Sequence, residues 1–435
     1  MSGSTDVHAH GGFAHAHPHR GRHRHLSHPR ASGRRGTVLD DPVYQRLLAA
    51  QVISLAGTGV TTVALGLLAY DLAGANAGAV LGAALALKMV AYVGLPPVTA
   101  AFAHRVDRRR LLIALDLIRF GVLLLLPFVD AIWQVMALIL VVNACAAGFT
   151  PAFQATLPDV LPDERDYTRA LSFSRVAYDL ADLLSPVAAA GLLVVMRYHG
   201  LFVVDAASFL VSAALLVSIR LPEPEAGRRV SERTRARITA GARRFAQVPR
   251  LRGLLALNLA AAAGSAMVIV NTVVLVRSDL HLGGTQVALA LAASGVGSVA
   301  TAFAVPGLLR RATDRTVMLS GAALLAGSLL VTAAVDGYAA LLAVWVVVGA
   351  GLALVQTPIG RLLQRSADPA DRPPLFAAQF ALSHLCWLAT YPIAGVLGAA
   401  VGVSTVSVVL ATITAVSVVA AAVLWPAAGE AVDDA

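Results

Sequence analysis

The stretch that decides the organisation of this chain is its most basic one, residues 221–252, which reads LPEPEAGRRVSERTRARITAGARRFAQVPRLR. It lies near the midpoint of the 435-residue chain and carries nine arginines between two long, almost uncharged blocks. Each block divides into about six apolar runs of the length that a helix needs to cross a lipid bilayer. The pattern predicts six membrane spans, a basic linker and six further spans.

The composition indicates an all-α membrane protein whose main partner is the lipid bilayer. Hydrophobic residues make up 57 % of the chain and charged residues only 14 %, outside the range of ordinary soluble domains. The formal net charge of +9 would fit a nucleic-acid binder, but the basic residues are confined to short loops, so nucleic acid is excluded as a partner. Cys145 and Cys386 fall inside apolar runs, so no disulfide framework is expected.

The distribution of arginines predicts the orientation. The predicted spans are 47–70, 78–103, 111–130, 132–154, 170–196, 200–220, 252–276, 286–309, 316–335, 338–360, 375–399 and 403–425. With the N-terminus inside, nearly all loop arginines fall on the cytoplasmic side, as the positive-inside rule requires. We expect a multi-pass protein of the cell (inner or plasma) membrane with both termini cytoplasmic. The expected segments are a disordered His- and Arg-rich tail (1–44), a first bundle (45–220), a basic linker (221–251), a second bundle (252–425) and a short acidic tail (426–435).

The N-terminal tail contains eight of the twelve histidines of the chain. They are His8, His10, His15, His17, His19, His23, His25 and His28. Several form His-x-His pairs, which allow a flexible segment to offer two imidazoles to one transition-metal ion, although they do not select among metals. The alternative is a solvated low-complexity tail without a specific ligand.

The two blocks superimpose at a constant offset of 207 residues. Asp107-Arg108 falls on Asp314-Arg315, and Thr150-Pro151 falls on Thr357-Pro358. A constant offset at several separated places predicts two pseudo-symmetric six-helix bundles, related by an axis along the membrane normal, with a substrate path between them.

The loop Ala103-His104-Arg105-Val106-Asp107-Arg108-Arg109-Arg110 resembles the signature loop of the major facilitator superfamily. The resemblance covers residues 45–425 and implies twelve transmembrane helices in the major facilitator fold. It also implies that Asp107, Arg108 and their repeat partners Asp314 and Arg315 latch helix ends on the cytoplasmic face. Asp116 and Arg119 lie one turn apart in the third span, so we interpret them as a structural pair tied to this latch, with gating as an alternative.

A narrower resemblance is carried by residues 68–74, 153–162 and 167–180, which read LAYDLAG, FQATLPDVLP and YTRALSFSRVAYDL. These stretches are similar to the nickel-resistance exporters of the superfamily, which also carry histidine-rich tails. The second stretch is shared more widely, including with siderophore exporters.

Ionisable side chains at membrane depth are functional candidates because they are costly to bury there. Asp179 and Asp182 lie one turn apart near the middle of the fifth span, where they could hold a divalent cation or a shared proton; the alternative is that Asp179 pairs with Arg175. Lys88 and His384 lie on the second and eleventh spans, which the resemblance places face to face. Cys386 is the repeat partner of Asp179, so a thiolate or an imidazole from one half and a carboxylate from the other could form one substrate or proton-coupling site. The alternative is that His384 and Cys386 are packed or hydrogen-bonded residues.

Two further carboxylates, Asp71 and Asp205, lie near the outer ends of spans. We expect water to reach both side chains there, which makes them weaker candidates for a role in transport.

These observations predict a secondary active transporter that exports a divalent transition metal by proton antiport with alternating access, with Ni²⁺ as the first choice and Co²⁺ or Zn²⁺ as alternatives. A proton-coupled exporter of an organic solute, such as a drug or a siderophore, is the second hypothesis. A membrane-bound metal sensor or binding module is the third. No enzymatic activity, resident cofactor or obligatory protein partner is expected.

Overall fold

A computed structural model describes residues 38–94, 107–161, 163–221, 242–367 and 372–426. Within these ranges the chain is helical, with short 3₁₀ and π segments and no β-strand. The eight tail histidines and most of the basic linker lie outside the described residues.

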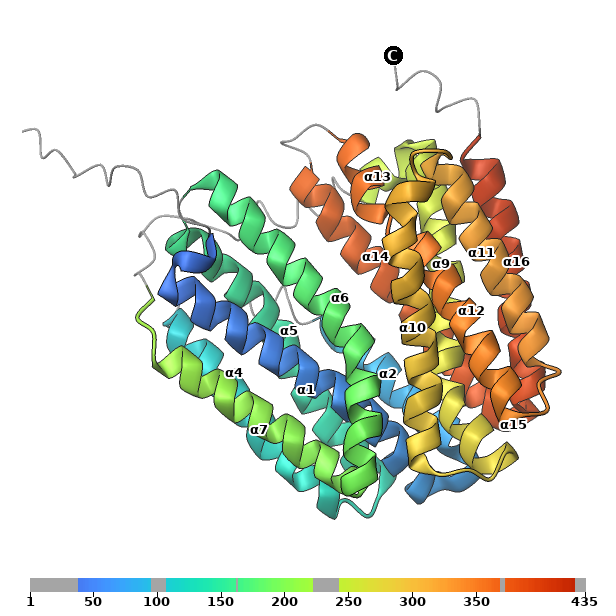
Figure 1. The fold of residues 1–435 in the computed structure, drawn as a ribbon, viewed down its shortest axis with the longest axis horizontal. Coiled ribbons are helices and arrows are strands. Elements are labelled where there is room, and N and C mark those ends of the chain that lie inside the picture. The colour runs from blue at the N-terminus through green and yellow to red at the C-terminus, as the bar shows by residue number, and fades with distance from the viewer. Residues whose placement is uncertain (1–37, 95–106, 162, 222–241, 368–371, 427–435) are drawn as a thin grey trace, which may run out of the picture. The chain divides into compact units, whose positions relative to one another are not determined.

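The first half contains six long helices (Figure 1). They are α1 (Pro42–Ala73), α2 (Ala77–Gly94), α4 (Arg108–Leu125), α5 (Ile132–Val160), α6 (Glu164–Val195) and α7 (Tyr198–Val217). The short 3₁₀ segments are η1 (Val38–Asp40), η2 (Gly74–Asn76) and η3 (Leu126–Phe128).

The second half repeats this order. Its long helices are α9 (Pro249–Val274), α10 (Gly284–Leu308), α11 (Asp314–Thr332), α12 (Tyr338–Gln356), α14 (Arg372–Pro392) and α16 (Val403–Leu424). Helix α13 (Ile359–Arg365) follows α12, the π-helical segments η4 (Leu275–Asp279) and η5 (Ile393–Leu397) follow α9 and α14, and α15 (Gly398–Val401) precedes α16.

Helix starts follow ordinary capping chemistry. The Asp41 carboxylate accepts hydrogen bonds from the backbone N–H groups of Val43 (2.8 Å) and Tyr44 (2.9 Å), and Pro42 occupies the first position of α1. Asp107 and Thr313 cap α4 and α11 in the same way. These two equivalent helices therefore begin within one residue of the same repeat position.

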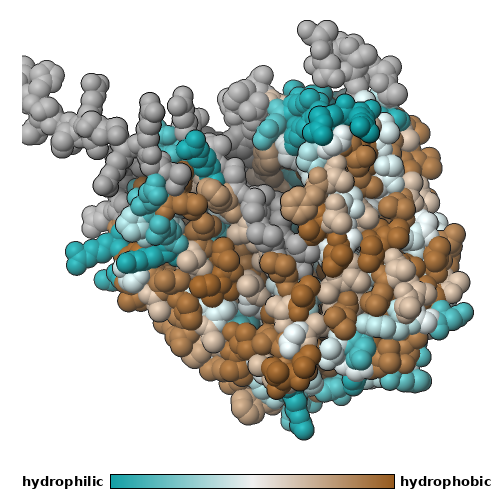
Figure 2. Space-filling view, viewed as in Figure 1, coloured by the Kyte–Doolittle hydropathy of each residue, from teal (hydrophilic) through white to brown (hydrophobic). Residues whose placement is uncertain are grey.

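The helices have the length and surface of membrane spans. Among the described residues, ten helical segments are long and apolar enough to cross a bilayer, and the first of them, 42–94, contains both α1 and α2. Helix α6 has a shorter apolar part, Leu184–Val195. Figure 2 shows hydrophobic residues over the sides of the bundle and hydrophilic ones gathered near its ends. The prediction of twelve transmembrane helices is confirmed.

The helix pairings of the first half recur in the second. Helix α1 packs against α6 and α7, as α9 packs against α14 and α16. Helix α4 packs against α5 and α7, as α11 packs against α12 and α16. The halves meet where α2 contacts α14 and where α6 contacts α10, two contacts that the repeat exchanges. The chain thus forms two pseudo-symmetric six-helix bundles, as predicted.

Buried amides mark the same repeat at the level of side chains. Gln51 of α1 accepts a hydrogen bond from Ser174 of α6 at 2.9 Å. In the second half, the amides of Asn258 on α9 and Gln379 on α14 donate to each other at 3.0 Å. Gln51 and Asn258 are repeat partners, and each joins the first helix of its half to the fifth.

Candidate functional site

Five side chains gather where α2 of the first half meets α14 of the second. We call them the α2–α14 cluster: Lys88, Tyr92, Phe380, His384 and Trp387. The His384 ring lies 4.0 Å from the Phe380 ring, 5.6 Å from the Tyr92 ring and 5.3 Å from the Trp387 ring, measured between centroids. The Lys88 ammonium lies 5.6 Å from the centre of the Tyr92 ring. The cluster is therefore an aromatic site with a cation at its edge, built by both halves.

Hydrogen bonding fixes the chemistry of the His384 ring. Its Nδ1 lies 2.7 Å from the Phe380 carbonyl oxygen. A carbonyl oxygen only accepts, so Nδ1 carries the hydrogen and Nε2 is the acceptor of the neutral ring. The indole N–H of Trp387 is buried and has no acceptor among the described residues. Ring faces of this kind bind apolar bodies, while an unsatisfied N–H favours a ligand that brings its own acceptor.

The structure brings together some of the predicted coupling residues. Lys88 and His384 both lie against the Tyr92 ring. Cys386 is a free, half-buried cysteine that takes no part in the ring contacts of the cluster. Asp179 and Asp182 fall in the middle of α6, and their side chains lie outside the described residues. Among the side chains that are described, no three His, Cys, Asp or Glu residues lie close enough together to hold a metal ion.

Asp116 and Arg119 form an ion pair in the core of the first half. Both are buried, and Ser212 of α7 donates a hydrogen bond of 2.7 Å to the second oxygen of Asp116. The Arg119 guanidinium lies 4.6 Å from the centre of the Phe149 ring and 4.2 Å from that of Phe209. Hydrogen bonds and ring faces thus surround a charge pair that lipid could not solvate.

The expectation that water reaches Asp205 is wrong. Its side chain lies between α7 and α1 with 1 % of its surface exposed. Asp71, for which the same expectation was made, is exposed at the end of α1 and accepts a 2.6 Å hydrogen bond from the Tyr198 hydroxyl. The prediction for Asp205 used only its position along the helix. It was wrong because α1 packs across α7 and covers the Asp205 side chain.

The signature-loop residues that are described, Asp107 to Arg110, hold three helix ends together. Asp107 accepts a hydrogen bond from the Arg110 backbone N–H at 2.8 Å. Arg108 forms an ion pair with Asp159 near the end of α5. Arg109 donates to the Leu216 carbonyl at 3.0 Å and to the Val217 carbonyl, the last carbonyls of α7.

The repeat partners perform the same task with the charges exchanged. Asp314, at the start of α11, lies 3.6 Å from Arg361 and 3.5 Å from Arg365, both on α13. Arg315 donates to the carbonyls of Trp425 at 2.5 Å and Ala422 at 3.1 Å, at the end of α16. A carboxylate–guanidinium pair therefore ties the third helix to the fourth helix in the first half and to α13, directly after the fourth helix, in the second half; arginine ties the third helix to the sixth in both.

At the opposite end of the helices the two halves are in direct contact. The Arg277 guanidinium of η4 lies 4.9 Å from the centre of the Tyr70 ring on α1. A Cβ placed on Gly395 of η5 would lie 2.2 Å from the Gly78 carbonyl oxygen and 3.0 Å from the Gly82 Cα of α2. Only glycine permits this approach, so the interface is closed at this end.

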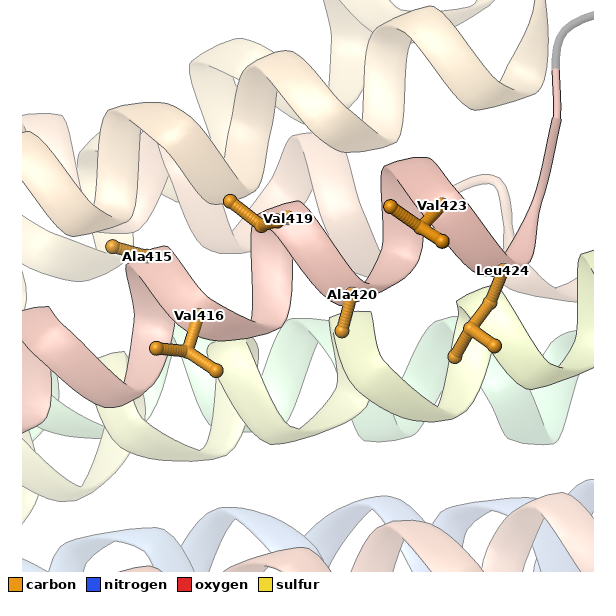
Figure 3. Close-up of a pocket in the computed structure, with 6 residues that line it drawn as sticks. All are labelled: Ala415, Val416, Val419, Ala420, Val423 and Leu424. Carbon is orange, nitrogen blue, oxygen red and sulfur yellow. The ribbon is translucent and has the colours of Figure 1, made fainter.

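A shallow groove on α16 is of a different kind. Its lining is aliphatic, contributed by Ala415, Val416, Val419, Ala420, Val423 and Leu424 (Figure 3). Val416, Val419 and Val423 are among the most exposed hydrophobic side chains of the helix. The groove belongs to the lipid-facing surface and offers no polar group to a substrate.

Sequence reasoning missed the aromatic members of the cluster. Phe380, His384 and Trp387 follow a spacing of four and three residues, which puts them on one face of a helix. That spacing was readable from the sequence. The approach of Tyr92 from α2 was not, because it depends on how the halves pack.

Comparisons with known proteins agree with this architecture. Two solved structures match most of the chain: the nucleoside transporter NupG, with a TM-score of 0.67 and 14 % identity over 88 % of this chain and 100 % of that one, and a bacterial homolog of the human lysosomal transporter Spinster, with a TM-score of 0.69 and 12 % identity over 89 % of this chain and 97 % of that one. At these identities the likeness shows the fold alone.

Curated relatives match by sequence over shorter stretches. Macrolide efflux protein A of Streptococcus pyogenes is 24 % identical over 185 residues, which are 41 % of this chain and 45 % of that protein. The protein of the same name from Enterococcus faecalis is 25 % identical over 153 residues, 33 % of this chain and 47 % of that one. The match thus spans less than half the length of these relatives. Their name assigns them to macrolide efflux, and they give no support to the narrower resemblance to nickel-resistance exporters.

A family model covers almost all of the membrane-spanning part. The model described as Major Facilitator Superfamily matches residues 47–274 and again residues 253–433, which together include every long helix but the first few residues of α1. Together with the twelve helices and their repeated pairing, this match shows that the chain belongs to the Major Facilitator Superfamily and is a multi-pass membrane transporter.

Proposed function

We propose that this transporter is a secondary active exporter of a large organic solute of the macrolide kind, which binds at the α2–α14 cluster. The observation that carries the proposal is the composition of that cluster. Tyr92, Phe380 and Trp387 offer ring faces to an apolar body, while Lys88 and the Trp387 N–H offer donors. A macrolide combines an extended apolar ring with many carbonyl and hydroxyl oxygens, so it matches both features.

The location of the cluster supports transport rather than storage of the ligand. Lys88 and Tyr92 belong to the first half, and Phe380, His384 and Trp387 to the second. Any rocking of one half against the other changes the spacing of these rings. Alternating access of this kind would tighten the site in one state and loosen it in the other.

Proton antiport is the proposed source of energy, with Asp179 and Asp182 as candidate coupling groups. Both belong to α6, which contacts α10 of the other half. The positive-inside pattern supports a cell-membrane protein with both termini cytoplasmic, so that outward movement of the solute would accompany inward movement of protons.

Export of a divalent transition metal is the second candidate. It rests on the eight tail histidines, an unusual density for which an organic-solute exporter has no evident need. In that case the tail would raise the local Ni²⁺ concentration, and Asp179 and Asp182 would bind the ion within the membrane.

Cells separate the two candidates. The chain is expressed in a macrolide-susceptible host deficient in efflux, and the steady-state accumulation of a radiolabelled macrolide and of Ni²⁺ is measured. We expect lower macrolide accumulation than in cells without the protein, unchanged by deletion of residues 1–37. Unchanged macrolide accumulation together with a tail-dependent fall in Ni²⁺ would replace the first candidate by the second.

A matched pair of variants locates the site in the same cells. His384→Ala removes the ring at the centre of the cluster, whereas Leu385→Ala changes the next residue of α14, which is exposed and outside the cluster. Loss of one aromatic contact of about 1 kcal/mol corresponds to roughly fivefold weaker binding. We expect His384→Ala to restore accumulation and Leu385→Ala to leave efflux intact; equal effects would place the site elsewhere.

A further inference from the structure

Asp205 is a buried carboxyl group that the α2–α14 cluster does not use. It lies on α7 seven residues after Tyr198, about 10 Å along the helix at 1.5 Å per residue. One per cent of its surface is exposed, and it forms no ion pair among the described residues. A carboxylate in this position would be an unpaired charge inside a membrane protein, which is costly.

The groups that face Asp205 from its own and the neighbouring helix are neutral. The Ser208 hydroxyl of α7 shares its hydrogen between the Asp205 backbone carbonyl at 2.7 Å and the Asp205 side chain at 3.1 Å. From α1, the backbone at Gly57 lies so close that a Cβ there would be 2.3 Å from the Asp205 oxygen. Thr61 of α1 is 93 % buried, and its hydroxyl lies beside the same carboxyl group without a hydrogen bond of normal geometry among the described residues. Buried polar groups are normally hydrogen-bonded, so an unpartnered hydroxyl beside a buried carboxyl group indicates a missing hydrogen-bond donor or acceptor at that place.

Among the described side chains, no charged group on the other packed helices is paired with Asp205. Helix α4 brings Asp116 and Arg119, and Arg119 is already paired with Asp116. Helix α5 brings the Cys145 thiol, which carries no positive charge. The side chains of Arg175, Asp179 and Asp182 on α6, one base and two acids, lie outside the described residues. Among the described side chains, this core therefore contains two carboxyl groups and one guanidinium.

We propose that Asp205 is a proton-binding site, holding a proton while α1 is packed against α7 and releasing it when α1 moves away. The site is separate from the α2–α14 cluster. Protonation lets the carboxyl group donate a hydrogen bond as well as accept one, so that Thr61 and Ser208 can satisfy it. Deprotonation leaves a charge pressed against the α1 backbone at Gly57, which favours separation of the two helices.

Helix α1 connects this site to the contact between the halves. Beyond Thr61, a Cβ on Gly66 would meet Val273 of α9 at 3.9 Å, and Tyr70 lies beneath Arg277 of η4. Movement of α1 at Gly57 would therefore alter the contacts at which the two halves close. This coupling role rests on the proposed function, whereas protonation of Asp205 does not.

The test is infrared spectroscopy of the purified full-length protein at neutral pH. Protonated carboxyl groups absorb at a different infrared frequency from carboxylates. Labelling aspartate with ¹³C shifts only the aspartate bands, so these bands can be identified in the protein without any substitution. We expect a protonated aspartate band whose intensity falls by the share of one carboxyl group in Asp205→Asn, which keeps the shape and neutrality of the side chain. Asp71→Asn, which changes the exposed carboxyl group of α1, should leave the band unchanged.

Two results would overturn the proposal. One is the absence of a labelled protonated band, or an unchanged intensity of that band in Asp205→Asn. The other is loss of the band on addition of NaCl but not of choline chloride at neutral pH, which would make the oxygens of Asp205, Thr61 and Ser208 a sodium site. If Asp205 is protonated but the protein transports no macrolide, the proton-binding site stands and only the proposed function is contradicted.

Discussion

The two halves of this transporter share their helices and pairings but differ in what their cores contain. The first half buries Asp116, Arg119 and Asp205. At the same positions of the repeat, 207 residues later, the second half has Ala323, Ala326 and Thr412. The fold therefore forms without these ionisable side chains, and the second half is the internal control that shows it. Ionisable side chains that the fold does not need, kept at membrane depth, indicate a function specific to the first half.

The ion pairs at the arginine-rich ends of the two halves connect equivalent segments, but the positive and negative partners are exchanged. In the first half the third helix supplies the cation, Arg108, and the fourth supplies Asp159. In the second half α11 supplies Asp314, and α13 supplies Arg361 and Arg365. The connection requires opposite charges on the two helices, whichever helix carries which sign.

The largest effect should follow from breaking the charge pair that only the first half has. Arg119→Ala leaves Asp116 buried without its cation, and removing one partner of a buried pair destabilises by about 3–5 kcal/mol. We expect a much lower thermal unfolding midpoint in detergent and loss of the monodisperse peak in size-exclusion chromatography.

The second half provides the control for that variant. Asp116→Ala combined with Arg119→Ala copies Ala323 and Ala326, so it should recover most of the lost stability despite removing two side chains. A double variant as unstable as Arg119→Ala would show that the first half depends on these residues for its fold. That result would contradict the inference that the fold forms without them.

The next largest effect concerns the glycine contact between the halves. Gly395→Val places side-chain atoms where the Gly78 carbonyl lies, and overpacking of this kind opposes the closed arrangement by about 1–3 kcal/mol. Spin labels attached at Asn76 and Asp279, exposed positions of the two halves, allow the distance between the labels to be measured by electron paramagnetic resonance, and this distance should be longer in Gly395→Val. Gly121→Val, where nothing lies within 4 Å of a Cβ, should leave the distance unchanged, and an unchanged distance in Gly395→Val would contradict the closure.

A smaller effect should follow from removing one donor of the α2–α14 cluster. Trp387→Phe keeps a ring but loses the buried N–H, and one hydrogen bond of about 1 kcal/mol corresponds to roughly fivefold weaker macrolide binding. Equilibrium dialysis of a labelled macrolide against the purified protein measures it. Trp133→Phe, on the exposed surface of α5, is the control; unchanged affinity in Trp387→Phe would remove the indole from the site.

The smallest effect should come from exchanging signs at the end of the first half. Arg108 and Asp159 are partly exposed, so either Arg108→Asp or Asp159→Arg alone should destabilise by up to about 1 kcal/mol. The combined exchange reproduces the polarity of the second half and should restore the thermal midpoint. A combined variant no better than the single ones would show that the sign of each helix matters.

Much of the architecture could be predicted from the sequence because it depends on local properties. Apolar runs of bilayer length, the basic segment at 221–252 and the offset of 207 residues specify the number of helices and their repetition. Ends were less predictable: α5 continues to Val160, beyond the predicted end at 154, and α6 begins at Glu164 rather than 170. The π-helical segments η4 and η5 left no readable signal.

The candidate site was only partly predictable, since it is made by packing between distant segments. Lys88 and His384 were selected as ionisable groups at membrane depth, and they lie against the same Tyr92 ring. Tyr92 itself has an ordinary sequence context. Asp205 was misjudged because its burial comes from Gly57 of α1, which lets the α1 backbone cover the carboxyl group.

The central claim, that this chain exports an organic solute in exchange for protons, is tested most directly in inside-out membrane vesicles. Uptake of a radiolabelled macrolide and of Ni²⁺ is measured with and without an imposed proton gradient, acid inside, using vesicles lacking the protein as the control. We predict gradient-dependent macrolide uptake above the control, reduced in His384→Ala, and no Ni²⁺ uptake. Gradient-dependent uptake of Ni²⁺ without the macrolide would contradict the account and return the tail histidines, Asp179 and Asp182 to the centre of the mechanism.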